Sequence, residues 1–433
     1  MNAEQQYIEL YREASPLIKE RSCAAMNAVR DDAFRMFEQK GFPTQKVERY
    51  KYTDVPAAFI PNYGLSLGVL DIKPSRYIYS FKDAPIDLTH YYNKIADCTD
   101  GITALNTALA HEGLLVYVPK NEQPDAPIQI DNWLQGTADT LMNRRVLVVL
   151  EEGAEATIIM NDKVGPPLPP SSMEGDTIRQ TPPIEGEMPQ GQRRAVSFLT
   201  TQVMEIVCKA GARLDIYEIE DTTPHCSRFS NVYIQEERDC VVKHNSITLF
   251  NGLSRNLCDV YLEGENAEVT LNGCAIGSGR QQIDNNTLID HRVPNCQSTE
   301  LYKYVLDDQA TGAFAGKILV EKDAQKTTSQ ETNANLCASR EARMYTQPML
   351  EIYADDVKCS HGSTVGILDQ TALFYMLQRG IPEAEARTLL KNAFMGQVID
   401  QIQHRPLRDR LYVKVEKRFR GEHEKCVDCH LCK

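Results

Sequence analysis

The feature that most restricts the fold of this chain is a long central region that reads as β-strand and almost nowhere as helix. Between residue 114 and about residue 360, short runs rich in Val, Ile, Leu, Tyr and Thr are bounded by Gly, Asn, Asp or Pro. Such runs predict strands separated by turns. The three- and four-residue apolar spacing of an amphipathic helix is nearly absent. An uninterrupted β region of this length must form a sandwich, a barrel or a β-solenoid.

A degenerate repeat within this region favours the solenoid. Three segments that begin at Gly153, Gly211 and Asn266 share one pattern: a turn residue, Ala, a charged residue, then apolar residues two positions apart. Stacked coils that turn at equivalent places produce such a pattern. The spacings are 58 and 55 residues. Because an expected insertion enlarges the first spacing, the sequence does not fix the period.

Helical patterns precede the β region. Apolar residues recur at three- and four-residue spacing over residues 3–40 and predict two helices, with a break near Pro16 and a stop at Gly41. Residues 47–55 are irregular and aromatic. This composition suits a loop held against the body of the protein.

The C-terminal part returns to helical periodicity. Residues 369–380 and 382–398 predict a hairpin of two helices that closes the β body. Within the β region, residues 164–191 hold seven of the chain's 21 prolines and predict a mobile loop. We therefore expect an N-terminal helical domain at residues 1–105, a β core at 106–365, a C-terminal helical domain at 366–422 and a cysteine-rich tail at 423–433.

Composition excludes several classes of function. Asp and Glu number 60 against 47 Lys and Arg, a formal net charge of −13, whereas a protein that grips phosphate backbones needs an excess of basic residues. We therefore expect no nucleic-acid partner. No secretory signal and no membrane-length apolar stretch is present, so we expect a cytoplasmic protein without a membrane partner. In the reducing cytoplasm, most of the 13 cysteines should be small buried side chains rather than members of disulfides.

Two glycine-containing runs resemble enzyme motifs without matching them. Residues 312–318 are one residue short of a phosphate-binding loop and have Ile318 where Ser or Thr must contact magnesium. Residues 362–366 resemble a nucleophile elbow, but Thr364 stands at the position of the nucleophilic Ser. Neither run supports nucleotide hydrolysis or acyl transfer by this chain.

Cys359 and His361 form the most informative pair of residues. In an extended strand alternate side chains share a face, so this thiol and this imidazole would lie close together. Such a pair can bind a soft or borderline metal, accept sulfur as a persulfide, or act as nucleophile and base. Alternatively, Cys359 is buried packing and His361 a polar strand end. Leu350 and Ile352 look core-facing. If the same alternation continued, Lys358 would face inward instead of Cys359 and His361, unless the strand bends.

The C-terminal tail has a cysteine pattern of its own. Cys426, Cys429 and Cys432 repeat a three-residue spacing that lets thiolates converge on one metal ion or one iron–sulfur cluster. His423 or His430 could supply a fourth ligand to zinc. The alternative is a frayed terminus that binds metal only adventitiously.

Longer stretches resemble a known family. Residues 351–362, which end in Asp-Asp-Val-Lys-Cys-Ser-His-Gly, are similar to the SufD branch of the SufB/SufD family of iron–sulfur cluster assembly proteins. The resemblance covers nearly the whole chain. It implies an N-terminal helical domain, a right-handed parallel β-helix and a C-terminal helical domain. Other matching segments are residues 48–53, 303–307, 316–318, 332–336 and 364–380.

The resemblance also implies a function. Members of this branch are non-catalytic scaffold subunits that pair with a SufB subunit through their β-helices and bind the SufC ATPase through their C-terminal helices. His361 is then the implied ligand of a transient iron–sulfur cluster at the interface with SufB, and Cys359 is its neighbour. The helical hairpin is the implied SufC dock. Its candidate contact residues are Leu373, Phe374, Tyr375, Arg379, Leu389 and Phe394.

The sequence leaves other functions open. The chain could instead be a metal or iron–sulfur carrier that acts through zinc or iron bound by its cysteine tail, a segment absent from the family pattern. A polysaccharide-active β-helix enzyme is disfavoured because a signal peptide is missing and cysteine is abundant. A homodimer in isolation also stays open.

Overall fold

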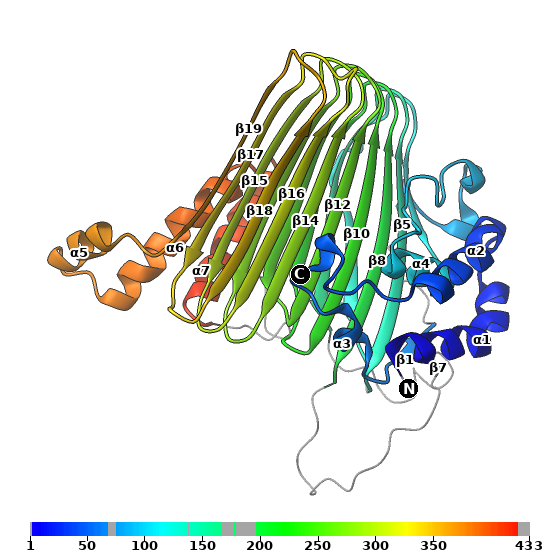
Figure 1. The fold of residues 1–433 in the computed structure, drawn as a ribbon, viewed down its shortest axis with the longest axis horizontal. Helices are drawn as coiled ribbons and strands as arrows, with labels where there is room; N and C mark the ends of the chain where they lie inside the picture. Colours follow the sequence, from blue (N-terminus) through cyan, green and yellow to red (C-terminus); the bar gives the residue numbers. More distant parts are fainter. Residues whose placement is uncertain (1, 68–74, 137, 166–176, 179–195, 423–433) are drawn as a thin grey trace, which may run out of the picture.

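The computed structural model describes residues 2–67, 75–136, 138–165, 177–178 and 196–422. These residues form a parallel β-solenoid with helices at its N-terminal and C-terminal parts, which confirms the predicted fold class (Figure 1). Most of the proline-rich insertion, predicted to be a mobile loop, lies outside the described residues. The cysteine tail lies outside them as well.

Two sheets form the walls of the solenoid, and the chain alternates between them. The 11-stranded sheet contains β1 (Gly64–Ser66), β2 (Ile78–Ser80), β3 (Leu114–Val118), β5 (Thr140–Leu150), β7 (Thr177–Ile178), β8 (Phe198–Cys208), β10 (Cys226–Glu236), β12 (Leu253–Leu262), β14 (Gln282–His291), β16 (Thr311–Val320) and β18 (Arg343–Ile352). The 8-stranded sheet contains β4 (Ile128–Leu134), β6 (Glu155–Val164), β9 (Arg213–Asp221), β11 (Val241–Phe250), β13 (Glu268–Gly277), β15 (Gln297–Leu306), β17 (Thr328–Cys337) and β19 (Lys358–Gly366). Apart from β7, which pairs antiparallel with β1, every strand from β4 to β19 pairs in parallel with its neighbours.

Successive coils turn at an equivalent corner, where one residue has a left-handed backbone conformation. The φ angle is 68° at Gly153, 71° at Gly211, 60° at Asp239, 62° at Asn266 and 64° at Asn295. Gly, Asn and Asp tolerate this conformation better than other residues. Because β6 pairs with β9, the first predicted repeat spacing is one coil that contains the insertion. The second spacing spans two coils, since β9 pairs with β11 and β11 with β13. The period is therefore about half of that second spacing.

Inward-facing residues of both sheets form the main core. Its centre contains five fully buried residues, namely Ile158, Ile206, Ile216, Val260 and Val269. Cysteines contribute to this packing as predicted, because all ten described cysteines are free and most of them are buried. The buried ones are Cys208, Cys226, Cys240, Cys258, Cys274 and Cys296.

The N-terminal helices cover the outer face of the 11-stranded sheet near its first strands (Figure 1). They pack against Leu141, Leu199 and Phe229, which point outward from β5, β8 and β10. The helices are α1 (Ala3–Arg21), α2 (Ala24–Lys40), α3 (Val55–Phe59) and α4 (Gly101–Leu109), with short 3-10 helices η1 (Glu48–Tyr50), η2 (Phe81–Asp83) and η3 (Leu88–His90).

The predicted helix break near Pro16 is wrong. Helix α1 continues through Pro16, and the break falls at Ser22, whose backbone is extended. The buried face of the helix, which includes Ala14 and Ile18, continues on both sides of the proline. Tertiary packing of that face therefore outweighs the hydrogen bond that proline removes. The predicted stop at Gly41 is confirmed, since Gly41 is the C-cap of α2 with φ 65°.

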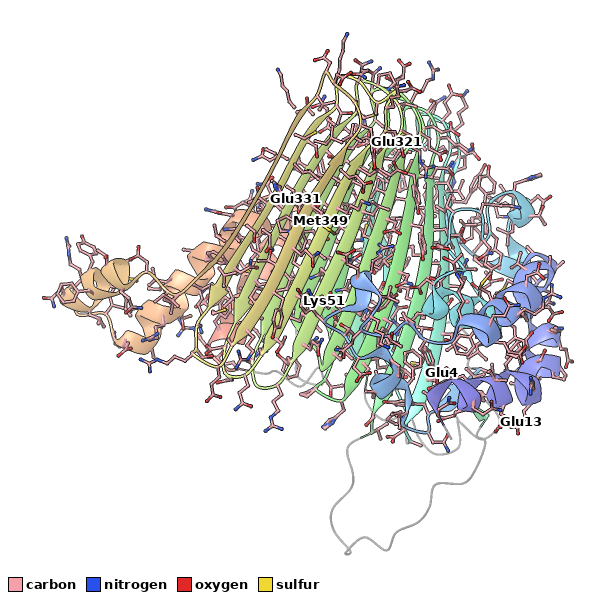
Figure 2. All side chains as sticks on the ribbon, viewed as in Figure 1. Glu4, Glu13, Lys51, Glu321, Glu331 and Met349 are labelled. Carbon is pink, nitrogen blue, oxygen red and sulfur yellow. The ribbon has the colours of Figure 1, made fainter. Side chains whose placement is uncertain are left out.

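The segment around η1 crosses the 11-stranded sheet and reaches its last strand, as the predicted loop against the body requires (Figure 2). Arg49 forms an ion pair with Asp259 of β12. Tyr52 stacks on Tyr345 of β18 at 4.6 Å between ring centroids. This crossing segment joins the N-terminal part to the last coil of the solenoid.

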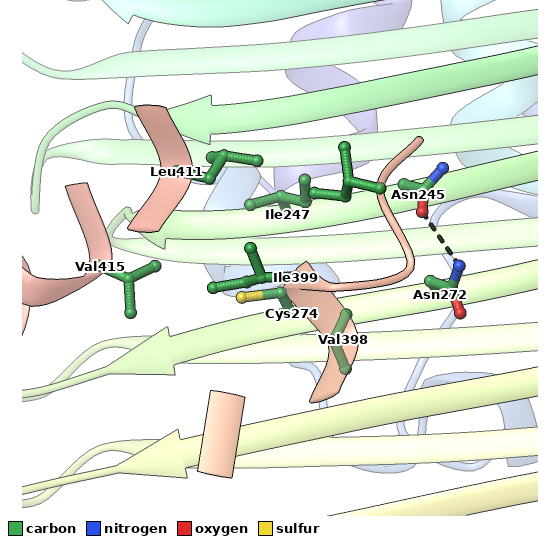
Figure 3. Close-up of a pocket in the computed structure, with 9 residues that line it drawn as sticks. Asn245, Ile247, Asn272, Cys274, Val398, Ile399, Leu411 and Val415 are labelled. Atoms are coloured by element: carbon green, nitrogen blue, oxygen red, sulfur yellow. Dashed lines mark hydrogen bonds between the residues drawn. The ribbon is translucent and has the colours of Figure 1, made fainter. Parts of the chain in front are cut away.

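The C-terminal helices are α5 (Gln370–Gln378), α6 (Glu383–Ile399) and α7 (Arg405–Phe419). The two helices predicted at residues 369–380 and 382–398 are confirmed as α5 and α6, and α7 adds a third helix. The prediction that this hairpin closes the β body is wrong, because α5 points away from the solenoid and α6 packs on its side, which leaves the last coil open (Figure 1). Helices α6 and α7 pack on the outer face of the 8-stranded sheet, where a small apolar pocket lies between Cys274, Val398 and Leu411 (Figure 3). Helix α5 projects away from the solenoid (Figure 1).

Candidate functional site

The last coil, formed by β18 and β19, is an open end of the solenoid (Figure 1). β18 pairs with β16 and β19 with β17, and no further strand in the described part of the chain pairs with either. Both strands therefore leave backbone N–H and C=O groups unpaired along one edge. Several large apolar side chains are exposed in and beside them, namely Tyr345, Ile352, Tyr353, Val365 and Ile367.

Strand register places Cys359 and His361 on one face of this coil. Cys359 lies opposite Ser329 and His361 opposite Glu331. Because Ser329 and Glu331 are buried inside the solenoid, the two residues of β19 face the same interior. Cys359 is half-buried and His361 is exposed. This is the shared face that strand alternation predicts.

Continued alternation from β18 would turn Lys358 inward instead of Cys359. A turn between β18 and β19 removes this conflict. Leu350 lies opposite the buried Ile318 and faces inward. β18 ends at Ile352, and the chain turns before β19 begins at Lys358, which is exposed. Cys359 packs against the same apolar cluster as Leu350. The turn thus resets the alternation, so that the inward positions of β19 are the odd-numbered ones.

The environment of Cys359 favours the protonated form of its thiol. Burial raises the pKa of the Cys359 thiol, although a backbone hydrogen bond involving Ser329 lowers it in part. A cationic or metal neighbour would be needed to stabilise the thiolate. Further along the same face, the hydroxyl groups of Ser363 and Thr346 hydrogen-bond across the coil at 2.6 Å. This bond ties β19 to β18 at the open end.

Two buried carboxyl groups lie beneath His361. Glu331 is opposite His361, and Glu300 is opposite Glu331 on the next strand; Figure 2 labels Glu331. Each of the two glutamates is 1% exposed. Burial raises the pKa of both carboxyl groups, and the neighbouring Glu300 raises that of Glu331 further.

Sequence reasoning missed this carboxyl pair. The available signal was the coil period, because Glu331 lies 30 residues before His361 and Glu300 lies 31 residues before Glu331. That period could not be used while the insertion obscured it. The structure thus adds two interior acidic residues to the candidate site.

Several charged groups deeper in the solenoid are paired, in contrast to Glu300 and Glu331. Arg228 contacts Asp162 at 2.7 Å and Glu218 at 2.9 Å, and Glu218 contacts His244 at 2.8 Å. Burial alone would raise the pKa of Asp162, but Arg144 and Arg228 hold it below its usual value. The interior therefore satisfies some acidic groups with fixed cations.

The predicted docking residues of the helical hairpin are only partly grouped at the surface. Phe374 and Tyr375 of α5 are 62% and 58% exposed, and Leu389 of α6 is 41% exposed. Arg379 donates a hydrogen bond to the Tyr375 hydroxyl at 2.7 Å. Leu373, by contrast, is buried.

Phe394 also belongs to packing more than to the surface. It is half-buried in the apolar cluster beneath α6, and the Lys303 ammonium lies 4.1 Å from the centre of its ring. Of the six predicted docking residues, the exposed ones are therefore Phe374, Tyr375, Arg379 and Leu389.

Both runs that resemble enzyme motifs form strands. Residues 312–318 lie within β16 and residues 362–366 within β19. An extended strand has neither the phosphate-cradling loop nor the strand-to-helix turn that those motifs require. The similarity is confined to residue types.

Metal ligation by the tail lies beyond the described residues. Cys426, Cys429, Cys432 and the histidines beside them are not among the described positions. Across the ranges that the structure does describe, no three His, Cys, Asp or Glu side chains come close enough together to hold a metal ion. Among these same residues, no helix is long and apolar enough to cross a membrane.

Two family models match the chain. The SufBD core domain of SUF-system FeS cluster assembly matches residues 185–394, and the SufBD N-terminal region matches residues 1–81 and 79–130. The core match includes the last coil, α5 and most of α6. The N-terminal match includes the crossing segment around η1.

Curated relatives agree with these models. The chain is 26% identical to the iron–sulfur cluster assembly protein SufD of Escherichia coli over 88% of this chain and 90% of that protein. It is 29% identical to an iron–sulfur cluster assembly SufBD family protein of Synechocystis, over 75% of this chain and 67% of the relative. It is 26% identical to the SufD protein of Bacillus subtilis over 74% of this chain and 67% of that protein. With a β-solenoid body, matching regions along most of its length and these relatives, the chain belongs to the SufBD family of iron–sulfur cluster assembly proteins.

Proposed function

We propose that this chain is a SufD-type scaffold subunit that has no catalytic activity of its own. Residues 106–365 would form the body that pairs with a SufB-like subunit, and residues 366–422 would bind a SufC-like ATPase. A nascent cluster would form at the interface with the SufB-like subunit, where His361 is a ligand and Cys359 lies beside it. The observation that carries the proposal is the exposure of His361 on the inward face of an open coil.

The edges of the last coil support pairing with a partner. Unpaired strand edges readily accept further strands, and soluble proteins commonly cover or charge them. Here Val365 is 50% exposed and Ile367 is 70% exposed beside such an edge. A partner that covers this end would also enclose His361, so that one surface serves both pairing and cluster binding.

The exposed face of α5 and α6 supports ATPase binding. Aromatic residues and Arg are enriched where partners bind most strongly, and Phe374, Tyr375 and Arg379 are all exposed in this part of the hairpin. Helix α5 also projects away from the body, which leaves its surface accessible to a partner (Figure 1). The two partners would then occupy separate surfaces.

Co-expression of this chain with SufB-like and SufC-like proteins tests the proposal. The wild-type chain should purify in a stable complex with both. Val365→Lys, which places a charge at the inward edge of β19, should lose the SufB-like subunit and keep the SufC-like one. Gln330→Lys is the control, because Gln330 is exposed on the neighbouring strand β17. Failure of the wild-type chain to bind either partner would refute the proposal.

A further inference from the structure

One row of interior positions runs along the 8-stranded sheet to His361. His244, Leu271, Glu300, Glu331 and His361 lie opposite one another on β11, β13, β15, β17 and β19. Neighbouring strands are about 4.8 Å apart. Side chains at consecutive positions of this row can therefore approach one ion from two sides.

Glu300 and Glu331 are buried without partners. Each residue is 1% exposed. None of their four carboxyl oxygens accepts a hydrogen bond from any described residue, and neither group forms an ion pair within that part of the chain. Burial of a polar group without a hydrogen-bond partner is unfavourable. Two neighbouring carboxyl groups without a donor among the described residues leave acceptor positions that a bound cation could fill.

The opposite wall of the solenoid supplies a second observation. Thr287 and Gly316 lie in register on β14 and β16, facing the carboxyl pair. Thr287 is 2% exposed, and the approach of its hydroxyl to Glu300 lowers the pKa of that carboxyl in part, yet the hydroxyl forms no hydrogen bond of normal geometry with any described atom. A buried donor and acceptor oxygen is thus aimed at the same space as the carboxyl groups.

Gly316 explains how Glu331 reaches into the interior. A Cβ atom at position 316 would lie 2.4 Å from Glu331 Oε1, closer than real contacts allow. The absence of a side chain there leaves room for the carboxyl group. The glycine, the hydroxyl and the two acids together form an oxygen-lined position inside the last coils.

We propose that Glu300 and Glu331 jointly bind one divalent cation inside the solenoid, on the interior side of His361. Carboxylate and hydroxyl oxygens suit hard or borderline divalent ions such as Mn²⁺ and Fe²⁺. The Thr287 hydroxyl and water would complete the coordination. That the physiological ion is Fe²⁺ rests on the proposed function, whereas the existence of the cation site does not.

The test uses the full-length chain without partner subunits. Cys426→Ser, Cys429→Ser and Cys432→Ser are introduced together, so that tail thiols cannot contribute ligands. Mn²⁺ is titrated into this protein, and free Mn²⁺ is measured by electron paramagnetic resonance. One Mn²⁺ should bind per chain. Glu300→Gln and Glu331→Gln should each weaken this binding at least tenfold.

Glu236→Gln is the matched control. Glu236 is also a fully buried carboxyl group without a partner among the described residues. Its strand neighbours are Cys208 and Leu262 rather than a second acid. The affinity for Mn²⁺ should stay within twofold of the parent protein in this variant.

Thr287→Val provides an independent variant should a glutamine variant fail to fold. It removes the hydroxyl and keeps the side-chain volume, and it should weaken Mn²⁺ binding severalfold. Absence of binding by the parent protein, or equal affinity in the parent and in the folded variants at 287, 300 and 331, would overturn the site. Because no partner subunit is present, that result would leave the proposed scaffold function untouched. Loss of partner binding would in turn leave the cation site untouched.

Discussion

His361 lies in register with Glu331, so an exposed imidazole on the last strand stands one strand outside a buried carboxyl group. The two residues belong to one row that continues to Glu300. The surface at which we propose cluster binding is therefore backed by acidic groups in the interior. This relationship makes the last coils the part of the molecule where substitutions are most informative.

Gly316→Ala should destabilise the protein, because the new methyl group would occupy the space of the Glu331 carboxyl. Overpacking of this kind costs about 1–3 kcal/mol. Gly362→Ala on β19 is the control, since a Cβ there meets nothing within 4 Å. Urea unfolding followed by circular dichroism measures both variants. Equal free energies of unfolding for the two variants would show that the Glu331 carboxyl does not need the space left by the absence of a side chain at Gly316.

Leu411→Ala should loosen the packing of α7 on the 8-stranded sheet. Leu411 is 1% exposed and packs in the apolar cluster shared by α6, α7 and the sheet. Removing a buried Leu side chain costs about 2–5 kcal/mol. Val413→Ala, at a position 42% exposed on the same helix, should change the free energy of unfolding by less than about 0.5 kcal/mol. A small effect at both positions would mean that α7 contributes little to the fold.

Acid should destabilise the protein through His291. Burial lowers the pKa of His291 to about 4 from 6.5, so the unfolded chain takes up a proton more readily than the folded one. The contribution to stability is present above pH 6.5 and is lost as the pH falls toward 4. For this group the loss at pH 5 is about 2 kcal/mol.

His291→Gln measures that contribution directly. The difference in unfolding free energy between pH 7.5 and pH 5 should be smaller in this variant than in the wild type. His90→Gln is the control, since the His90 side chain is 77% exposed. If His291→Gln and the wild type lose the same stability on acidification, the folded protein tolerates a charged imidazole at this position.

Phe374→Ala should weaken binding of the SufC-like ATPase at least tenfold, because it removes a large exposed side chain from the proposed dock. The thermal transition of the isolated chain should stay unchanged, since Phe374 is 62% exposed. Leu373→Ala should instead lower that transition, because Leu373 is 5% exposed. Calorimetric titration with the ATPase and thermal unfolding separate the two effects. Undiminished binding by Phe374→Ala would place the dock elsewhere.

Much of the fold could be predicted from local pattern. The strand-rich region, the repeated corner at Gly153, Gly211 and Asn266, and the helices on either side all follow from residue spacing. The number of residues per coil could not be predicted in this way, because the insertion lengthens one coil. The break at Ser22 was also missed, since it depends on tertiary packing around Pro16 rather than on the intrinsic preference of proline.

The candidate site was only partly predictable. The shared face of Cys359 and His361 follows from strand alternation, once the turn after Ile352 resets the phase. Glu300 and Glu331 could not be connected to them, because residues about one coil apart become neighbours only when the coil length is known. The exposed part of the hairpin likewise depends on which side of α5 packs, and α5 is too short for its periodicity to decide this.

Cluster assembly by the His361→Ala variant tests the central claim most directly. The variant is reconstituted with SufB-like and SufC-like partners, ATP, iron and a sulfur source, and cluster is measured by visible absorption and by iron and sulfide content. The complex should form normally, but cluster should fall at least tenfold. Ser360→Ala, on the opposite face of β19, should assemble cluster like the wild type. Undiminished cluster in the His361→Ala complex would contradict the account.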